Sequence, residues 1–433
     1  MIGIPGKVVF GDGDELSLPN MVNIRQKFND AKVDDIPTTI AHEFQRSDAQ
    51  SAIKPGMKVA VGVGSRGIRN LQIIVASVID ELKRLGAEPF IVPAMGSHGG
   101  ATAEGQIHVL ETYGITEGSV GAKIKASMET VLIGQLEEIS IHCDQYAFAA
   151  DAIVLINRVK PHTDFKGDIE SGLSKMAVIG LGKHRGASLW HRQGFDQFKR
   201  VIPAAAEIVF EKAPIALGVA VVENAYDETA HIEVLPTASI LTEEKRLLKL
   251  AKSLMPRLLI DSIDVLIVDE IGKDISGAGM DPNITGRTVS GLNGGFSAPP
   301  IQKIVVRDLT KKTAGNACGL GVADIITRRL LDKIDFPTTY ANTITSTVLD
   351  GAKIPVIMNS DWDAIALALK TCYRIQPEKA KIVRIKNTLE LEEIQVSVPC
   401  LSALSMSENI DVLSAPYSLQ FDPEGNLKAE DLL

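Results

Sequence analysis

The chain has 433 residues, 45% of them hydrophobic, and a formal net charge of −9 at pH 7. This length and apolar content are enough for a sizeable core and predict two or three domains. The negative balance argues against a nucleic-acid-binding protein, which presents a basic face. It does not exclude an anionic small molecule, because a local cluster of cations is enough to bind one.

The sequence contains four cysteines that lie far apart, Cys143, Cys318, Cys372 and Cys400. No two of them have the spacing of a zinc or iron–sulfur site, so we expect reduced thiols. No run reaches the ~18 apolar residues that span a bilayer. Gly, Pro and Asp interrupt the first residues too early for the apolar part of a signal peptide. These features predict a soluble, cytoplasmic protein with no membrane segment.

The first part of the chain predicts alternating strands and helices. Residues 7–10 predict a short strand, and the polar residues 20–52 predict short surface helices. Strand and helix patterns then alternate, at residues 57–63, 70–85, 89–93 and 103–113. In the first of these helices the apolar residues recur with the helical period. The alternation predicts a parallel sheet with right-handed crossovers.

The middle of the chain continues this pattern. The run at 152–157, AIVLIN, is apolar and rich in β-branched residues, which is typical of a strand covered on both faces. Residues 187–212 are amphipathic and predict a helix that Pro203 kinks or splits. A strand at 215–222 and a helix at 240–254 follow.

A second pattern of strands and helices begins at Asp264, after a junction predicted at residues 256–262. Its strands are predicted at residues 265–269, 304–308, 356–358 and 381–385, and its helices at residues 322–334 and 361–369. A glycine-rich segment, 272–300, separates the first two strands. Irregular stretches of this length are usually functional or disordered.

We therefore predict an α/β fold with two α/β domains whose mostly parallel sheets flank a cleft. Residues 1–260 form the N-terminal domain, which carries the candidate functional residues. Residues 261–433 form the C-terminal domain, which closes the cleft. The last ~20 residues can return to the N-terminal domain, because chain ends often lie near each other.

Two histidines, His98 and His162, each follow a predicted strand of the N-terminal domain. If both strands belong to one sheet, the two imidazoles can face one cleft. Histidine titrates near neutral pH, so such a pair could exchange protons with a bound substrate. Two unrelated histidines are the alternative, and the spacing alone favours that alternative.

The segment around His98 is rich in glycine and leads into a predicted helix. Gly96 and Ser97 precede the histidine, and Thr102 is a plausible N-cap. Unpaired N–H groups and the helix dipole favour anions at such a place. An ordinary flexible turn explains the glycines equally well.

Other candidate residues supply cations, metal ligands or a nucleophile. Arg66 and Arg69 follow the first strand and are the best candidates for binding a carboxylate or phosphate; the alternative is a solvated arginine. His184 and His191 could bind nickel, copper, zinc or iron, although a lone histidine is more often a surface residue. Lys175 borders an apolar run and is a candidate for covalent chemistry, against the commoner case of a lysine whose charge reaches solvent.

Four segments of the sequence resemble a known family. They are VGVGSRGIRN at 61–70, GSHGGATAEGQ at 96–106, NRVKPHTDFKGDIESGLSK at 157–175 and LWH at 189–191. In order and approximate spacing they resemble the nickel-pincer lactate racemase family and its 2-hydroxy-acid racemase and epimerase homologues. The segments lie in the N-terminal half, and the C-terminal half resembles the family in length and pattern only.

The resemblance implies a nickel-pincer nucleotide as cofactor, a pyridinium-3,5-dithiocarboxylic acid mononucleotide that holds nickel. It implies that Lys175 anchors the cofactor and that His191, sixteen residues later, is the nickel ligand. His98 and His162 would then be the acid/base pair. Gly96, Ser97 and Thr102 would approach the cofactor or substrate. The resemblance also implies cofactor-synthesis proteins as partners and a small 2-hydroxy acid as substrate.

The sequence departs from the family in two places. The usual Asp-x-Thr-Arg after the first strand is replaced by SRGIR at 65–69, which leaves open whether Arg66 or Arg69 binds an anion. The segment from His162 to Lys175 is a few residues longer than in lactate racemases, which brings Lys166, Asp168 and Glu170 near the site. The first departure hints at a different acid substrate, and the second leaves open whether Lys175 is the residue that anchors the cofactor.

The residue types suit inversion of a 2-hydroxy acid. A hydride leaves the C2 carbon while one histidine takes the hydroxyl proton, and return of both from the other face inverts the centre. Two alternatives stay open. One is a metal-dependent hydrolase or lyase with His98, His162 and His191 as direct ligands. The other is a non-catalytic relative that binds a nucleotide or a sugar acid.

Overall fold

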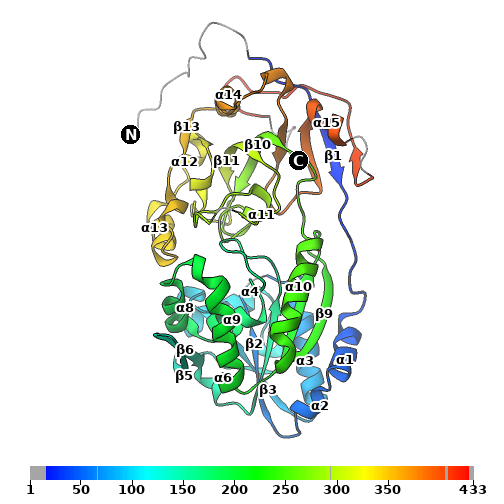
Figure 1. Ribbon diagram of the computed structural model, residues 1–433, viewed down its shortest axis with the longest axis vertical. Coiled ribbons are helices and arrows are strands. Elements are labelled where there is room, and N and C mark those ends of the chain that lie inside the picture. The colour runs from blue at the N-terminus through cyan, green and yellow to red at the C-terminus, as the bar shows by residue number, and fades with distance from the viewer. Residues whose placement is uncertain (1–15, 66, 293, 405–407, 429–433) are drawn as a thin grey trace. The chain divides into compact units, whose positions relative to one another are not determined.

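The computed structural model describes residues 16–65, 67–292, 294–404 and 408–428 (Figure 1). The strand expected at 7–10 and the candidate residue Arg66 lie outside these ranges. The chain divides into two compact units. The inserted unit is Asn29–Met255, and the terminal unit combines residues 16–28 with residues 256–428. In the described ranges, no helix is long and apolar enough to cross a membrane.

The inserted unit contains a six-stranded sheet in the order β4-β3-β2-β7-β8-β9. Its strands are β2 (Lys58–Val63), β3 (Glu88–Pro93), β4 (Lys123–Ile124), β7 (Ala152–Arg158), β8 (Ile215–Glu223) and β9 (Thr229–Pro236). All neighbours are parallel except β8 and β9. The central strands are buried along nearly their whole length, as their apolar sequences predict.

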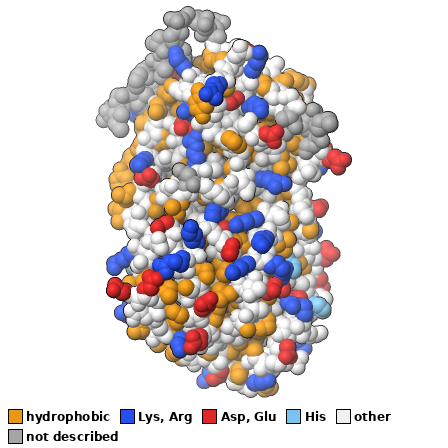
Figure 2. Space-filling model, viewed as in Figure 1, with side chains coloured by type: hydrophobic (Ala, Val, Ile, Leu, Met, Phe, Trp, Pro, Cys, Tyr) orange, Lys and Arg blue, Asp and Glu red, His pale blue; other side chains and the backbone are white. Residues whose placement is uncertain are grey.

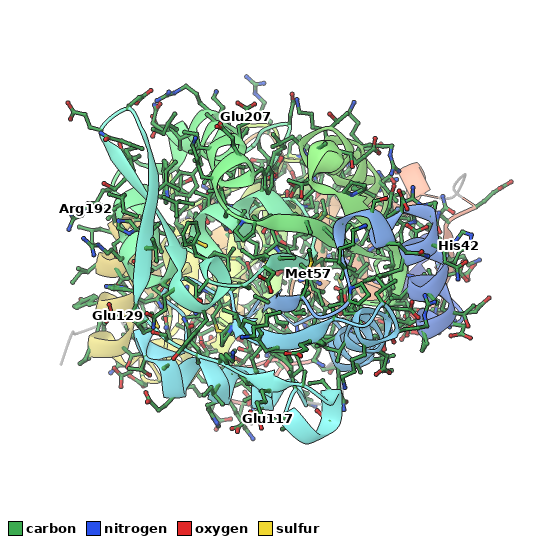
Figure 3. All side chains as sticks on the ribbon, turned by 90° about the horizontal axis from the view of Figure 1, so that it is seen from below. His42, Met57, Glu117, Glu129, Arg192 and Glu207 are labelled. Atoms are coloured by element: carbon green, nitrogen blue, oxygen red, sulfur yellow. The ribbon has the colours of Figure 1, made fainter. Side chains whose placement is uncertain are left out.

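Helices surround this sheet, and Figure 3 shows Met57, just before β2, near the centre of the view with His42, Arg192 and Glu207 around it. The helices are α1 (Ile36–Arg46), α2 (Ala49–Ala52), α3 (Leu71–Arg84), α4 (Ala103–Thr112), α5 (Glu117–Val120), α6 (Gln145–Phe148), α7 (Leu173–Lys175), α8 (Lys183–His191), α9 (Phe195–Lys212) and α10 (Ile240–Leu254). The hairpin β5 (Thr130–Leu136) and β6 (Ile139–Asp144) packs against α8 and α9. The apolar stripe of α3 joins the core, and each such buried aliphatic side chain contributes ~1.5–3 kcal/mol.

Residues 187–212, predicted to be helical, lie in two helices, α8 and α9. The first of them begins at Lys183, so the predicted start at 187 was wrong. The break falls at Gly194, whose φ of +80° cannot continue a helix. Pro203 lies inside α9 and does not split it. The break matters for the site, because His191 thereby becomes the last residue of α8.

The terminal unit contains an eight-stranded sheet in the order β13-β12-β11-β10-β14-β15-β1-β16. Its strands are β1 (Met21–Gln26), β10 (Ile263–Ile271), β11 (Ile301–Leu309), β12 (Ile325–Thr327), β13 (Val356–Met358), β14 (Ile382–Ile385), β15 (Glu393–Ser397) and β16 (Ile410–Val412). Its helices are α11 (Pro282–Thr285), α12 (Arg328–Leu331), α13 (Phe336–Thr345), α14 (Asp361–Thr371) and α15 (Val398–Leu404). The five strands from β13 to β14 are parallel, and the other three are antiparallel to their neighbours. The predicted α/β class with mostly parallel sheets is confirmed.

Two parts of the predicted organisation differ from the structure. The segment 20–52, expected to form short surface helices, begins instead with β1, which pairs with β15 and β16 of the terminal unit. Residues 16–28 therefore group with residues 256–428, which include the described part of the C-terminal segment. The helix predicted at 322–334 forms only in part, as α12, because residues 325–327 are the strand β12, which pairs with β11 and β13.

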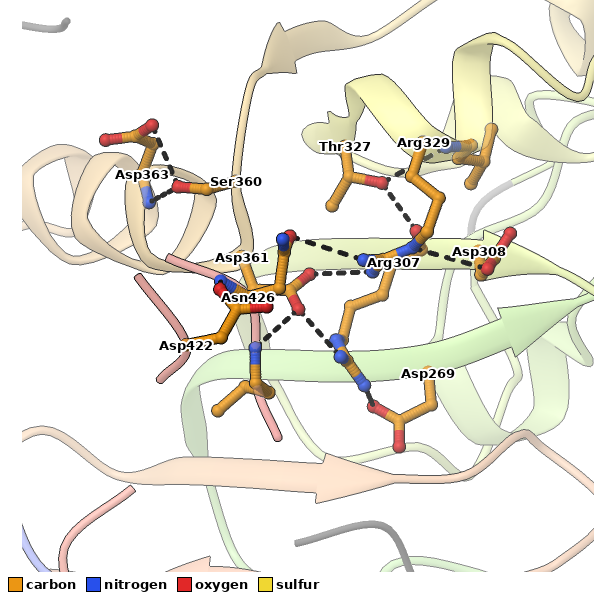
Figure 4. A network of polar contacts seen from close by, with 12 residues as sticks. Asp269, Arg307, Asp308, Thr327, Arg329, Ser360, Asp361, Asp363, Asp422 and Asn426 are labelled. Carbon is orange, nitrogen blue, oxygen red and sulfur yellow. Dashed lines mark hydrogen bonds and ion pairs between the residues drawn. The ribbon is translucent and has the colours of Figure 1, made fainter. Parts of the chain in front are cut away.

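A row of buried charges crosses the sheet of the terminal unit (Figure 4). Arg307 on β11 donates to Asp269 on β10 and to Asp361 at the start of α14, each at 2.7 Å. Arg384 on β14 donates to Asp269 at 2.9 Å. Asp361 also accepts the backbone N–H of Leu427 at 2.9 Å. The network thereby fastens the C-terminal segment to the sheet. Elsewhere charges of both signs are interspersed on the visible surface (Figure 2).

Candidate active site in the inserted unit

The candidate residues of the inserted unit follow three adjacent strands. Val63 at the end of β2 pairs with Pro93 at the end of β3 and with Ile156 of β7. The loops that follow these strands carry Ser65, His98 and His162 respectively. Both histidines therefore belong to one edge of one sheet, the carboxyl edge, where ligands of open α/β sheets bind.

His98 is exposed, and the loop that carries it is held from below. Its Nδ1 shares a hydrogen bond with the hydroxyl of Ser65, and the Tyr113 hydroxyl donates to the Ser65 carbonyl at 2.8 Å. Gly96, at φ +60°, packs against the π-helix Met176–Gly180 through a hydrogen bond from its N–H to the Gly180 carbonyl. The loop after β3 and the helix that follows Lys175 are therefore in contact.

The loop of His162 leaves β7 and returns to it. Lys160 and Ser171 exchange two backbone hydrogen bonds, and the Asn157 side chain donates to the Gly172 carbonyl at 2.6 Å. These contacts close the loop at its base. The chain then enters α7 with Lys175 at its end. The longer segment noted in the sequence therefore forms a loop that follows β7 and is closed at its base by these hydrogen bonds.

Glu170 organises the inside of this loop. Its buried carboxylate accepts the N–H of His162 at 2.7 Å and the ammonium of Lys252 from α10 at 2.7 Å. The ammonium of Lys166 lies 3.5 Å from the same carboxylate and donates to the His162 carbonyl at 2.9 Å. Glu170 and Lys166, in the longer segment noted from the sequence, thus hold the backbone of His162.

Three candidate residues converge beside this loop. The Nζ of Lys175 lies 2.7 Å from Nε2 of His162. The backbone N–H of Asp164 donates to Nδ1 of His162 at 3.0 Å, and Nε2 is the ring atom that faces Lys175. Burial, followed by the charge of Lys175, lowers the pKa of His191 to about 4. His191 is therefore neutral at pH 7 and lies within the field of the same lysine.

Aromatic side chains line this cluster. The ring of His162 packs against Phe165, with centroids 4.5 Å apart. The ring of His191 packs against Phe195 and Phe198, with centroids 5.6 and 5.5 Å apart. In the part of the chain that the structure describes, the buried Nδ1 of His191 has no hydrogen-bond partner. A buried polar atom without a hydrogen-bond partner in an apolar setting lowers the stability of the fold unless a ligand binds it.

The start of the helix that carries Lys175 is capped from another helix. Glu244 of α10 is buried and accepts the N–H of Ser174 at 3.0 Å and the Ser174 hydroxyl. A Cβ on Gly172 would lie 1.8 Å from Glu244 Oε1, so glycine is required there. Burial raises the pKa of Glu244 to about 7, and its hydrogen bonds with Ser174 oppose that shift.

The arginines at this edge are arranged differently from the expectation. Arg69 is exposed and its Nε lies 3.5 Å from Glu228 Oε1, while Arg66 is outside the described residues. Arg158, at the end of β7, was not selected from the sequence although it stands inside one of the motifs. Its guanidinium pairs with Glu223, and within the described ranges its buried Nε has no hydrogen-bond partner.

The remaining candidates divide into structural and surface residues. Thr102 is the N-cap of α4, as predicted, and accepts the Gly105 N–H at 3.0 Å. Ser97 is partly buried beside His98, and His184 is exposed. Among the residues described, no three His, Cys, Asp or Glu are grouped so as to hold a metal ion, so the alternative site of three direct histidine ligands does not form there.

No family model matches the chain, and no curated protein matches it. Among solved structures, the chain is similar to the lactate racemase apoprotein from Thermoanaerobacterium thermosaccharolyticum, with a TM-score of 0.50 and 11% sequence identity. The match covers 85% of this chain and 99% of that chain. At this identity the likeness concerns the fold, so the two-unit α/β architecture described above is the one that this protein shares with that racemase.

Proposed function

We propose that the inserted unit carries the active site of a racemase or epimerase that inverts C2 of a 2-hydroxy acid with a nickel-pincer nucleotide. The observation that supports this most is the convergence of His162, Lys175 and His191. Three residues that the family resemblance assigns to proton transfer, anchoring and nickel ligation come from separate segments and meet at one place. The shared fold with a lactate racemase is consistent with the proposal.

The residues fit such a cofactor. Nickel prefers a neutral imidazole, and His191 is neutral with a buried Nδ1 that lacks a partner in the described chain. Lys175 presents its amine beside that ring and beside His162. His191 would bind the nickel and Lys175 would anchor the nucleotide. When bound, the cofactor supplies a hydride acceptor that side chains cannot provide.

The side chains of the chain itself carry the protons and hold the substrate. His98 and His162 stand at one sheet edge, on either side of the β2 loop, and would each take or return the hydroxyl proton for one configuration. Ser65 orients His98, while Glu170 and Asp164 orient His162. Arg158, together with Arg69 or Arg66, would attract the substrate carboxylate.

The test is to produce the protein together with cofactor-synthesis proteins and to measure whether it carries a covalent cofactor and nickel. We expect an intact mass that exceeds the chain mass, an adduct mapped to Lys175 by peptide mass spectrometry, and nickel near one per chain. Lys175→Ala should lack the adduct, and Lys199→Ala, which alters an exposed lysine of α9, should retain it. The loaded protein should interconvert the two configurations of an acid in a panel from lactate to malate and sugar acids.

Two results would contradict this proposal. Protein without adduct and nickel, from a strain in which a known nickel-pincer enzyme is loaded, would argue against the cofactor. Loaded protein that inverts no acid of the panel would favour a non-catalytic binding protein.

A further inference from the structure

A lysine buried beneath the His98 loop plays no part in the chemistry proposed above. Lys183, the first residue of α8, has no exposed surface. Its ammonium donates to the Pro93 carbonyl and to Gln106 Oε1 at 3.0 Å, and lies 3.2 Å from Asp144 Oδ2. Its backbone φ is +54°, a conformation that residues other than glycine seldom adopt. The buried charge and the unfavourable backbone conformation of Lys183 each cost free energy, so favourable contacts must compensate for both.

The surroundings of Lys183 indicate a structural role and not a nucleophile. Two oxygen atoms accept hydrogen bonds from the ammonium, and the carboxylate of Asp144 pairs with its charge, so the nitrogen is engaged on all sides by oxygen atoms of the protein. Burial lowers the pKa of Lys183 and raises that of Asp144, and the attraction between the two charges opposes both shifts. Asp144 also accepts the Ala147 N–H at 2.9 Å, which fixes its carboxylate.

Gln106 passes the contact on to the loop of His98. Its side-chain oxygen accepts from Lys183, so its amide nitrogen must point the other way. That nitrogen donates to the Gly96 carbonyl at 2.9 Å and to the His98 carbonyl at 3.3 Å. Without Lys183 the side-chain oxygen of Gln106 would lose this donor, and only the bonds to Gly96 and His98 would hold the amide in place. One ammonium therefore holds Pro93 directly and Gly96 and His98 through one amide.

We propose that Lys183 is a positioning residue for His98, fixing the loop from Pro93 to His98 through the Pro93 carbonyl and Gln106. This rests on the proposed function in which His98 exchanges the substrate proton. A group one ångström out of place can cost ~10²-fold in rate, so loss of the ammonium should act on turnover more than on binding. Lys183→Arg retains a charged donor and should restore part of what Lys183→Met loses.

The first experiment measures the loop itself, independently of activity. Hydrogen–deuterium exchange is followed in the cofactor-free full chain by mass spectrometry of peptides covering 94–102. Lys183→Met should raise exchange there at least ~10-fold, Lys183→Arg less, and Lys245→Met, an exposed lysine of α10, not at all. Peptides of β2 and β7 should stay as in the unaltered protein. Unchanged exchange at 94–102 in a folded Lys183→Met protein would overturn the proposal.

If Lys183→Met fails to fold, Gln106→Met tests the same link, because it removes the amide and leaves the Lys183 and Asp144 pair. It should loosen 94–102 alone, and a normal loop in this variant would also overturn the proposal. The second experiment uses loaded enzyme. Lys183→Met should lower kcat ~10²-fold with KM and nickel content unchanged, and Lys183→Arg should recover part of that loss. An equal change in KM or nickel content would overturn it.

The two proposals fail separately. A loosened loop in Lys183→Met protein, in an enzyme that inverts no acid, would leave the loop contact standing and remove the proposed function. A rigid loop in an active racemase would do the reverse.

Discussion

The Nζ of Lys175 lies 2.7 Å from Nε2 of His162, and the two residues are thirteen positions apart along the chain. The proposed cofactor anchor and one of the two proposed proton carriers therefore share a hydrogen bond in the cofactor-free protein. Any modification of the Lys175 nitrogen therefore changes the group that lies next to Nε2 of His162. Loading and proton transfer are consequently coupled through one atom pair, and experiments must separate them.

The acid/base pair makes the first prediction. His98→Ala and His162→Ala should each lower interconversion in both directions at least ~10²-fold, the low end for general acid–base catalysis. The double variant should lose little more than either single variant, because the two residues act as a unit. Activity is measured at equal nickel content, which separates proton transfer from loading. His108→Ala, at the exposed surface of α4, is the control, and full activity in either single variant would make that histidine structural.

Nickel retention gives the second prediction. His191→Ala should lose nickel to a chelator faster than unaltered protein and yet keep the covalent nucleotide, because His191 is a ligand and Lys175 the anchor. Metal analysis and intact mass after dialysis measure the two separately. His184→Ala, exposed on the same helix, should behave as unaltered protein. Equal nickel content in His191→Ala and unaltered protein would remove the ligand assignment.

The third prediction concerns Glu244 and pH. Burial raises its pKa in the folded protein from 4.5 to about 7, so the folded state binds the proton more tightly than the unfolded state. Its contribution to stability is complete below pH 4.5 and is lost as pH rises to about 7. The stability of unaltered protein minus that of Glu244→Gln should therefore fall by about 3 kcal/mol over that window.

Tryptophan fluorescence can isolate this effect. The chain has two tryptophans, Trp190 in the inserted unit and Trp362 in the terminal unit. In a Trp362→Phe background, urea unfolding followed at the buried Trp190 reports the inserted unit alone. Glu243→Gln on the same helix is the control, and its difference from unaltered protein should not depend on pH in this way. A difference for Glu244→Gln that is flat in pH would contradict the prediction.

The fourth prediction tests the buried charges of the terminal unit. Asp361→Asn leaves Arg307 with a buried, partly unpaired charge and should destabilise the unit by ~3–5 kcal/mol, seen at Trp362 in a Trp190→Phe background. Asp363→Asn, two residues later, should change stability by less than ~1 kcal/mol. The double variant Arg307→Met, Asp361→Leu should recover part of the loss, because it removes both charges. If the double variant lost as much stability as Arg307→Met and Asp361→Leu lose separately when added together, that result would contradict a paired network.

Local sequence pattern predicted the elements that build the site, and long-range contacts decided the rest. β2, α3, β3 and α4 follow apolar periodicity and a cap at Thr102, all readable within a few residues. The apolar residues at 322–334 are spaced as in a single helix, and only pairing with β11 and β13 makes residues 325–327 a strand. When a spacing of apolar residues is compatible with both a helix and a strand, the segment alone does not determine which of the two forms.

The site shows the same division. The candidate histidines could be selected because they follow strand ends. Their supports were harder to find: the family resemblance placed Glu170 near the site but gave it no role, and Lys183 and Glu244 look like ordinary charged residues, which are normally solvated. Only the fold shows that these three side chains are buried against the loops that carry His162, His98 and Lys175.

The pairing of β1 sets the order in which this protein can be completed on the ribosome. Met21 pairs with Ser397, and Ile24 pairs with both Ile394 and Val412. β1 must therefore wait, with both of its edges unpaired, until β15 and β16 have been synthesised. The inserted unit has all of its strands by Pro236 and can fold meanwhile. Such an early, apolar, unpaired strand is a binding site for a chaperone during translation and a point of aggregation without one.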